Sequence, residues 1–120
     1  MRMKADSRGH FITTAQINGE DVRVMVDTGA SAVALPYQDA ERLGFRLSRS
    51  DFTLGVSTAN GNTRVAPISL KEVRVGDVVV RDVAAAVSEP GALRMTLLGM
   101  SFLKRLKAFH IEGDSITLHQ

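Results

Sequence analysis

Asp27, Thr28 and Gly29 form the triplet of this sequence whose residue types are best suited to chemistry. It follows the apolar run of residues 22–26 and leads into small residues that begin with Ala30. A carboxylate placed where a strand breaks at a glycine, beside small residues that let another backbone approach, can be held rigidly enough for catalysis. In the alternative interpretation, Asp27 merely opens an Asx-turn in which Gly29 supplies a positive φ.

A second motif, Leu97-Leu98-Gly99, lies far along the chain and is followed by a helical pattern over residues 101–106. Two apolar residues and a glycine before a short helix predict a buried strand. We expect this strand to run past the loop that carries Asp27.

With Asp27-Thr28-Gly29-Ala30-Ser31 upstream and Leu97-Leu98-Gly99 downstream, the chain resembles the retropepsin-like aspartic proteases, in particular their bacterial single-domain members. The resemblance also includes Leu35-Pro36, Ala40, Leu43-Gly44 and residues 58–61, and so covers residues 11–112. One departure is the spacing of 72 residues (99 minus 27) between the two motifs, which is long beside compact viral members and leaves residues 88–94 without a role.

In this family the aspartate is catalytic, the threonine hydroxyl bonds across a dimer, and a glycine-containing hairpin forms a flap over the substrate. The resemblance therefore implies that Asp27 is the catalytic residue. It implies an active-site loop of Thr28, Gly29 and Ala30, a substrate-binding flap of Thr58, Ala59, Asn60 and Gly61, and a supporting second loop of Leu97, Leu98 and Gly99.

Composition narrows the class of protein. The 120 residues, 44% of them hydrophobic, suffice for one core, and the formal net charge of +2 comes from scattered residues without a basic block. We therefore expect no nucleic-acid partner. The absence of cysteine excludes disulfides and thiolate metal sites, and His10, His110 and His119 are too scattered for a metal cluster. We expect neither metal nor cofactor.

The sequence predicts one domain over residues 10–120, preceded by a polar tail or linker over residues 1–9. No stretch reaches the roughly 20 apolar residues of a membrane span. The compartment stays open. For a bacterial protein, a periplasmic or membrane-anchored location is expected if an N-terminal segment precedes these residues.

Alternating polar and apolar residues dominate the chain and predict an all-β fold of many short strands. Helices are predicted only at residues 37–43, after Pro36 and before Gly44, and at residues 101–106. A hairpin is predicted around the turn Asn60-Gly61-Asn62. Strands are predicted at residues 11–17, 22–26, 52–59, 63–75, 78–87, 108–111 and 115–119. Together with the resemblance, this pattern predicts a retropepsin-like closed β-barrel with one or two short helices that acts as a homodimer.

Aspartic-protease chemistry needs two carboxylates that share one proton, and the sequence holds a single Asp-Thr-Gly. A catalytic Asp27 therefore requires a second copy from another chain, most simply across a two-fold axis. The terminal strand at residues 115–119, with Ile116 and Leu118 on one face, offers an edge for that partner. The predicted activity is that of an endopeptidase on extended protein or peptide segments.

Two alternatives remain open from the sequence. One is a retropepsin-fold dimerisation or peptide-binding module with weak or absent hydrolysis. The other is a plain β-barrel in which Asp27 is a turn residue.

Overall fold

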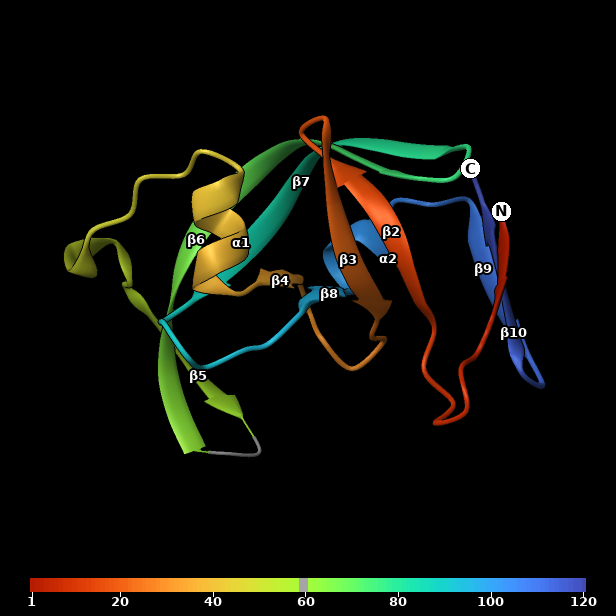
Figure 1. The fold of residues 1–120 in the computed structure, drawn as a ribbon, viewed down its shortest axis with the longest axis horizontal. Helices are drawn as coiled ribbons and strands as arrows, with labels where there is room; N and C mark the ends of the chain where they lie inside the picture. Colours follow the sequence, from red (N-terminus) through yellow and green to blue (C-terminus); the bar gives the residue numbers. More distant parts are fainter. Residues whose placement is uncertain (59–60) are drawn as a thin grey trace.

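A closed β-barrel is the main feature of the computed structural model, which describes residues 1–58 and 61–120 (Figure 1). The strands are β1 (Arg2–Lys4), β2 (Ile12–Ile17), β3 (Glu20–Val26), β4 (Val33–Leu35), β5 (Leu54–Thr58), β6 (Gly61–Val75), β7 (Val78–Ser88), β8 (Thr96–Leu98), β9 (Ala108–Glu112) and β10 (Ser115–His119). The helices are α1 (Tyr37–Arg42) and α2 (Met100–Leu103), and a short 3-10 helix, η1 (Arg49–Asp51), precedes β5.

Seven strands form one sheet in the order β2-β3-β8-β4-β7-β6-β5, and an additional pairing of β2 with β6 closes six of them into a ring. The seventh strand, β5, pairs with β6 and extends beyond the ring as part of a hairpin (Figure 1). The predicted all-β, closed-barrel fold with two short helices is confirmed.

The barrel forms because its strands carry apolar residues at every second position. In β3, Val22 and Val24 are fully buried, while Asp21 before them and Arg23 between them are exposed. Because side chains of a strand point alternately to its two faces, this pattern places one face in the core and the other outside. The same alternation of side chains explains why most valines of β6 and β7, the longest pair of strands, are buried.

A separate three-stranded sheet, in the order β1-β10-β9, packs beside the barrel (Figure 1). The sequence predicted that residues 115–119 offer a free edge to a partner, and this prediction is wrong. Strand β10 is the central strand and pairs on both sides, with Arg2 opposite Thr117 and with Thr117 opposite His110. Ile116 and Leu118 are buried in the core of the same chain, which is why the strand is drawn inward.

The N-terminal residues also differ from the predicted polar tail over residues 1–9. Arg2–Lys4 form β1, because Met1 and Met3 pack against the core and alternate with exposed polar residues. The turn that follows is organised by the carboxylate of Asp6. The backbone N–H groups of His10 and Arg8 each donate to it at 2.9 Å, and these bonds hold the pKa of the Asp6 carboxyl below its ordinary value.

The helices lie close to their predicted positions. Helix α1 follows Pro36, which suits a helix start because proline has no N–H to leave unpaired. Helix α2 begins one residue earlier than predicted, at Met100, and is shorter, since its regular part ends at Leu103. Neither helix, nor any other in the described part of the chain, is long and apolar enough to cross a membrane.

Candidate active site

Asp27 lies directly after β3, at the point where the parallel strand β8 ends beside it. The register pairs Met25 with Leu97 and Val26 with Leu98, so the two predicted motifs are neighbours. The Asp27 N–H donates to the Leu98 carbonyl at 3.1 Å and so continues the ladder by one residue. The strand β8 therefore fixes the backbone of Asp27, as the sequence predicted.

The loop after Asp27 orients its carboxylate. The Gly29 N–H donates to Asp27 Oδ1 at 2.9 Å, and the Ala30 N–H donates to the Asp27 carbonyl at 3.2 Å. Asp27 is partly buried, whereas Thr28 and Gly29 are exposed. One carboxylate oxygen is thus held by the loop while the residue stays accessible from the side of the loop.

Gly99 interlocks the two loops. A Cβ at this position would lie 2.7 Å from the Ala30 carbonyl oxygen and closer still to that of Ala32, so only glycine fits. The next residue, Met100, donates its N–H to the Ala30 carbonyl at 2.8 Å. The loop after Asp27 consequently rests on the end of β8 and the start of α2.

Ser101 is a structural residue of this site that the sequence reasoning missed. Its hydroxyl accepts a hydrogen bond from the Val33 N–H at 2.8 Å and donates one to the Ala84 carbonyl at 2.6 Å. It therefore ties α2 to β4 and β7, just after the Asp27 loop. The only hint in the sequence was its place two residues after Gly99.

The predicted flap corresponds to the hairpin of β5 and β6, which projects from the lower side of the molecule in Figure 1, the side on which the loop after β3 also lies. Thr58 pairs with Gly61, so Gly61 and Asn62, which were predicted to lie in the turn, belong to β6. Ala59 and Asn60 lie outside the described residues. Gly61 adopts a φ of 109°, a conformation that favours glycine.

Glu89 gives a role to part of the loop that the sequence left unassigned. Its Oε1 accepts hydrogen bonds from the Thr63 hydroxyl at 3.2 Å and from the Arg64 N–H at 3.1 Å. The segment between β7 and β8 is thereby attached to the β6 side of the flap hairpin. No sequence pattern connects residues 25 positions apart in this way.

Taken together, the structure brings the Asp27 loop and the second loop into direct contact and places the flap hairpin as a separate projection. Within residues 1–58 and 61–120, no group of three or more histidine, aspartate or glutamate side chains is arranged to hold a metal ion. The chemistry that this arrangement can supply is that of a positioned, accessible carboxylate.

A family model described as gag-polyprotein putative aspartyl protease matches residues 13–105, which is most of the chain. The chain therefore belongs to this family of aspartyl proteases. Its fold is that of the retropepsin-like members.

Two curated relatives cover 92% of this chain: an uncharacterized protein from the cobV 5' region of a Sinorhizobium species, at 43% identity, and an uncharacterized protein of Rickettsia prowazekii, at 41%. The chain spans about half the length of these relatives, since the matched region is 47% of each.

Among solved structures, a retropepsin-like aspartic protease from Rickettsia conorii superposes with a TM-score of 0.88 and 38% identity, covering 98% of this chain and 88% of the other. EIAV protease in complex with the inhibitor HBY-793 superposes with a TM-score of 0.68 over 86% of this chain and 93% of the other. Its identity of 21% makes this second likeness one of fold alone.

Proposed function

We propose that this chain is an aspartic endopeptidase in which Asp27 and the partner subunit's Asp27 activate water at a homodimer interface. The observation that carries the proposal is the fixation of Asp27. Its backbone is bonded to Leu98, its carboxylate is oriented by Gly29, and its loop is seated on Gly99. Membership of the aspartyl protease family supports the same assignment.

The proposed chemistry follows from two carboxylates about 3 Å apart that share one proton, since both cannot ionise at that separation. The ionised carboxylate takes a proton from water as the water attacks the scissile carbonyl carbon. The protonated carboxyl donates a hydrogen bond to the carbonyl oxygen, and the proton held by the pair later passes to the leaving amine. The sequence holds a single Asp-Thr-Gly motif, so in this scheme the second carboxylate comes from a second copy of the chain, and a homodimer is part of the proposal.

The proposed substrate is an extended protein segment. Strand β5 is the last strand of its sheet, and Leu54 and Val56 on it are exposed at 51% and 36%. An extended peptide can pair with such an edge through its main chain, while alternate side chains enter pockets. Thr58, Ala59, Asn60 and Gly61 are the proposed flap residues, and Thr28 is the proposed contact across the dimer.

The test is cleavage of unstructured protein substrates by the wild type and by Asp27→Asn between about pH 4 and 7, the range in which a dyad can hold one proton. We expect Asp27→Asn to lose at least about 10³-fold in kcat, as removal of a catalytic carboxylate does in other hydrolases. Asp82→Asn is the matched control, because the exposed Asp82 has a φ of 54°, which asparagine tolerates.

Cleavage that survives Asp27→Asn would rule out the mechanism. Absence of cleavage by the wild type, combined with equal peptide binding by the wild type and Asp27→Asn, would instead favour the peptide-binding module.

A further inference from the structure

Two histidines lie side by side on the three-stranded terminal sheet of β1, β10 and β9. His110 is on the edge strand β9 and His119 is on the central strand β10. Their ring centres are 5.2 Å apart, and the ring planes are inclined at 73°. Nine residues (119 minus 110) separate the two in the sequence. The hairpin of β9 and β10 therefore assembles a pair that was not apparent from the sequence.

The register of this hairpin places both rings on one face of the sheet. His110 is directly opposite Thr117, and His119 follows Thr117 by two residues. Directly opposed residues share a face of a sheet, and so do alternate residues of a strand. Ile116 and Leu118 have the opposite orientation and are buried, so the two histidines lie on the outer face, where both are exposed.

The separation of the rings fits two imidazoles bound to one metal ion. Imidazole nitrogens bind Zn²⁺ at about 2.0–2.1 Å, and such bonds at angles of about 90–110° put the two ring centres about 4.5–5.3 Å apart. The observed 5.2 Å lies in this range. Rotation of the exposed side chains between rotamers can turn a nitrogen of each ring toward a shared ion without moving the backbone. An edge-to-face contact of two rings has the same separation, so a binding measurement has to distinguish the two cases.

The charges of the terminal sheet also favour a cation beside the pair. Glu112 lies on β9 two residues after the first histidine, so it is on the same outer face, and it is exposed. The basic residues of this sheet, Arg2 and Lys4, are on β1, which β10 separates from β9. The Arg2 guanidinium donates to the Ser115 hydroxyl at 3.3 Å, at the opposite end of β10 from His119. The strand β9 therefore adds an acid to this face, and the bases lie on the far strand.

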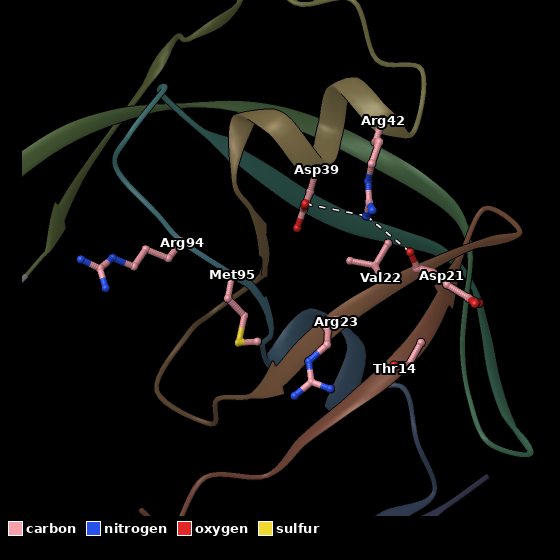
Figure 2. A pocket seen from close by; sticks show the side chains of 8 residues that line it. All are labelled: Thr14, Asp21, Val22, Arg23, Asp39, Arg42, Arg94 and Met95. Carbon is pink, nitrogen blue, oxygen red and sulfur yellow. Dashed lines mark hydrogen bonds and ion pairs between the residues drawn. The ribbon is translucent and has the colours of Figure 1, made fainter.

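A second place with two carboxylates is less suited to a cation. A cavity of about 350 Å³ lies between β3, α1 and the segment before β8 (Figure 2). Its wall carries two acids, Asp21 and Asp39, and three bases, Arg23, Arg42 and Arg94. Arg42 lies 3.8 Å from Asp39 Oδ1 and donates to the Asp21 carbonyl at 3.4 Å. A cation in this cavity would be repelled by the surplus of positive charge.

We propose that His110 and His119 bind one divalent transition-metal ion of the kind that prefers imidazole ligands, such as Zn²⁺. Neutral imidazole suits Zn²⁺, Ni²⁺ and Cu²⁺, whereas Mg²⁺ prefers oxygen ligands. The chain supplies two ligands and water fills the other positions, since the described residues hold no metal-binding group of three or more histidine, aspartate or glutamate side chains. The site is on a different sheet from the strands that hold Asp27 and does not depend on the proposed endopeptidase function.

The experiment titrates the protein with ZnCl2 and, for comparison, with MgCl2 by isothermal titration calorimetry in a buffer that does not chelate metals. The variants are His110→Gln, His119→Gln and the double variant. His10→Gln is the matched control, because His10 is also exposed and bonds to Asp6 through its backbone. Asp27→Asn tests whether the ion binds at the proposed catalytic residue instead. Thermal unfolding without metal verifies that each variant is folded.

The wild type should bind one Zn²⁺ per chain and no Mg²⁺ at the pair. Either substitution removes the intramolecular second bond of a chelate, so each single variant should weaken Zn²⁺ binding by about 10²-fold and the double variant by little more. Zn²⁺ should raise the melting temperature of the wild type, because it binds the folded chain in preference to the unfolded one. That rise should disappear in all three variants of the pair and persist in His10→Gln and Asp27→Asn.

Equal Zn²⁺ affinity in the wild type and in either single variant would overturn the site. Losses that merely add up in the double variant would also overturn it, because they indicate two independent histidines. Side-chain NMR of the wild type gives a test without substitution. The ring resonances of His110 and His119 should shift together as ZnCl2 is added, while those of His10 stay in place. Ring resonances of the pair that do not respond to Zn²⁺ would refute the proposal.

Discussion

Gly99 shows how the absence of one side chain affects the position of Asp27, the proposed catalytic residue. Its Cα faces the carbonyl oxygens of Ala30 and Ala32, which belong to the loop that orients Asp27. Close packing of backbone against backbone transmits displacement, because carbonyl groups cannot rotate away as a flexible side chain can. The position of Asp27 is therefore set by a residue that takes no part in the chemistry.

We expect Gly99→Ala to lower the free energy of unfolding by about 1–3 kcal/mol, the usual effect of overpacking. Displacement of the Asp27 loop should also reduce kcat by about 10²-fold, since small misplacements of catalytic groups have effects of that size. Thermal unfolding and peptide cleavage measure the two effects. Gly55→Ala is the matched stability control, because a Cβ there meets no atom within 4 Å. An unchanged melting temperature and unchanged kcat in Gly99→Ala would contradict the interlocked arrangement.

At the level of elements, the segment between β7 and β8 connects the flap hairpin to the rest of the site. Glu89 accepts hydrogen bonds from Thr63 and Arg64 on β6. The segment also leads directly into β8, whose end bonds to Asp27. The segment thus connects the hairpin of β5 and β6 to the strand that fixes the backbone of Asp27.

Replacement of Glu89 by alanine should loosen the flap hairpin. Loss of the acceptor for the Arg64 N–H should speed hydrogen exchange at this amide about fivefold, corresponding to one hydrogen bond of about 1 kcal/mol. Glu112→Ala removes an exposed carboxylate on the distant strand β9 and should leave Arg64 unaffected. Exchange at Arg64 that is equal in wild type and Glu89→Ala would show that the contact does not anchor the hairpin.

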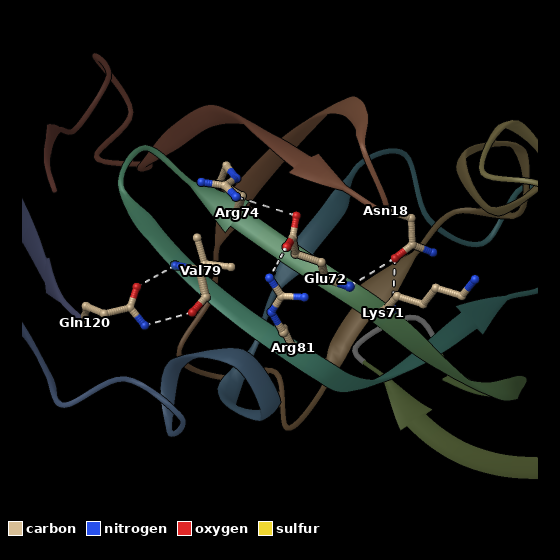
Figure 3. A network of polar contacts seen from close by, with 7 residues as sticks. All are labelled: Asn18, Lys71, Glu72, Arg74, Val79, Arg81 and Gln120. Carbon is tan, nitrogen blue, oxygen red and sulfur yellow. Dashed lines mark hydrogen bonds and ion pairs between the residues drawn. The ribbon is translucent and has the colours of Figure 1, made fainter.

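For the molecule as a whole, the closed barrel is a rigid support. Where β2 meets β6, Asn18 Oδ1 accepts hydrogen bonds from the Lys71 and Glu72 N–H groups at 2.8 and 3.2 Å (Figure 3). Near the turn of the β6–β7 hairpin, the Gln120 side chain bonds to both backbone groups of Val79. The Asn18 contact joins two strands of the barrel, and the Gln120 contact attaches the end of the terminal sheet to it. In the proposed homodimer, each chain can therefore present its Asp27 loop without refolding.

The shared-dyad proposal makes a prediction about mixtures. With random exchange of subunits, a tenfold excess of Asp27→Asn over a fixed amount of wild type leaves about a tenth of the wild-type chains with a wild-type partner. Cleavage, measured with substrate in large excess, should fall in proportion. An equal mass of an unrelated protein serves as the control. Undiminished cleavage would mean that a single chain carries a complete site and would contradict the dyad.

The sequence by itself determined the features that depend on local pattern. Alternation along the strands, the break at Gly29 and the apolar pair before Gly99 predicted an all-β barrel and the contact between the Asp27 loop and β8, and the structure confirms both. These predictions succeed because periodicity and backbone freedom act within a few residues.

Only the tertiary structure decided which distant groups meet. The bonds of Ser101 to Val33 and Ala84, and those of Glu89 to β6, join residues 17 to 68 positions apart and leave no trace in local pattern. The short strand β1 also depends on distant residues. It is a strand because it pairs with β10 and because Met1 and Met3 pack against the core, whereas its three residues alone do not predict a strand. An open edge, a cavity and a contact between two histidine rings are likewise properties of what surrounds a residue, and those surroundings exist only when the whole chain has packed.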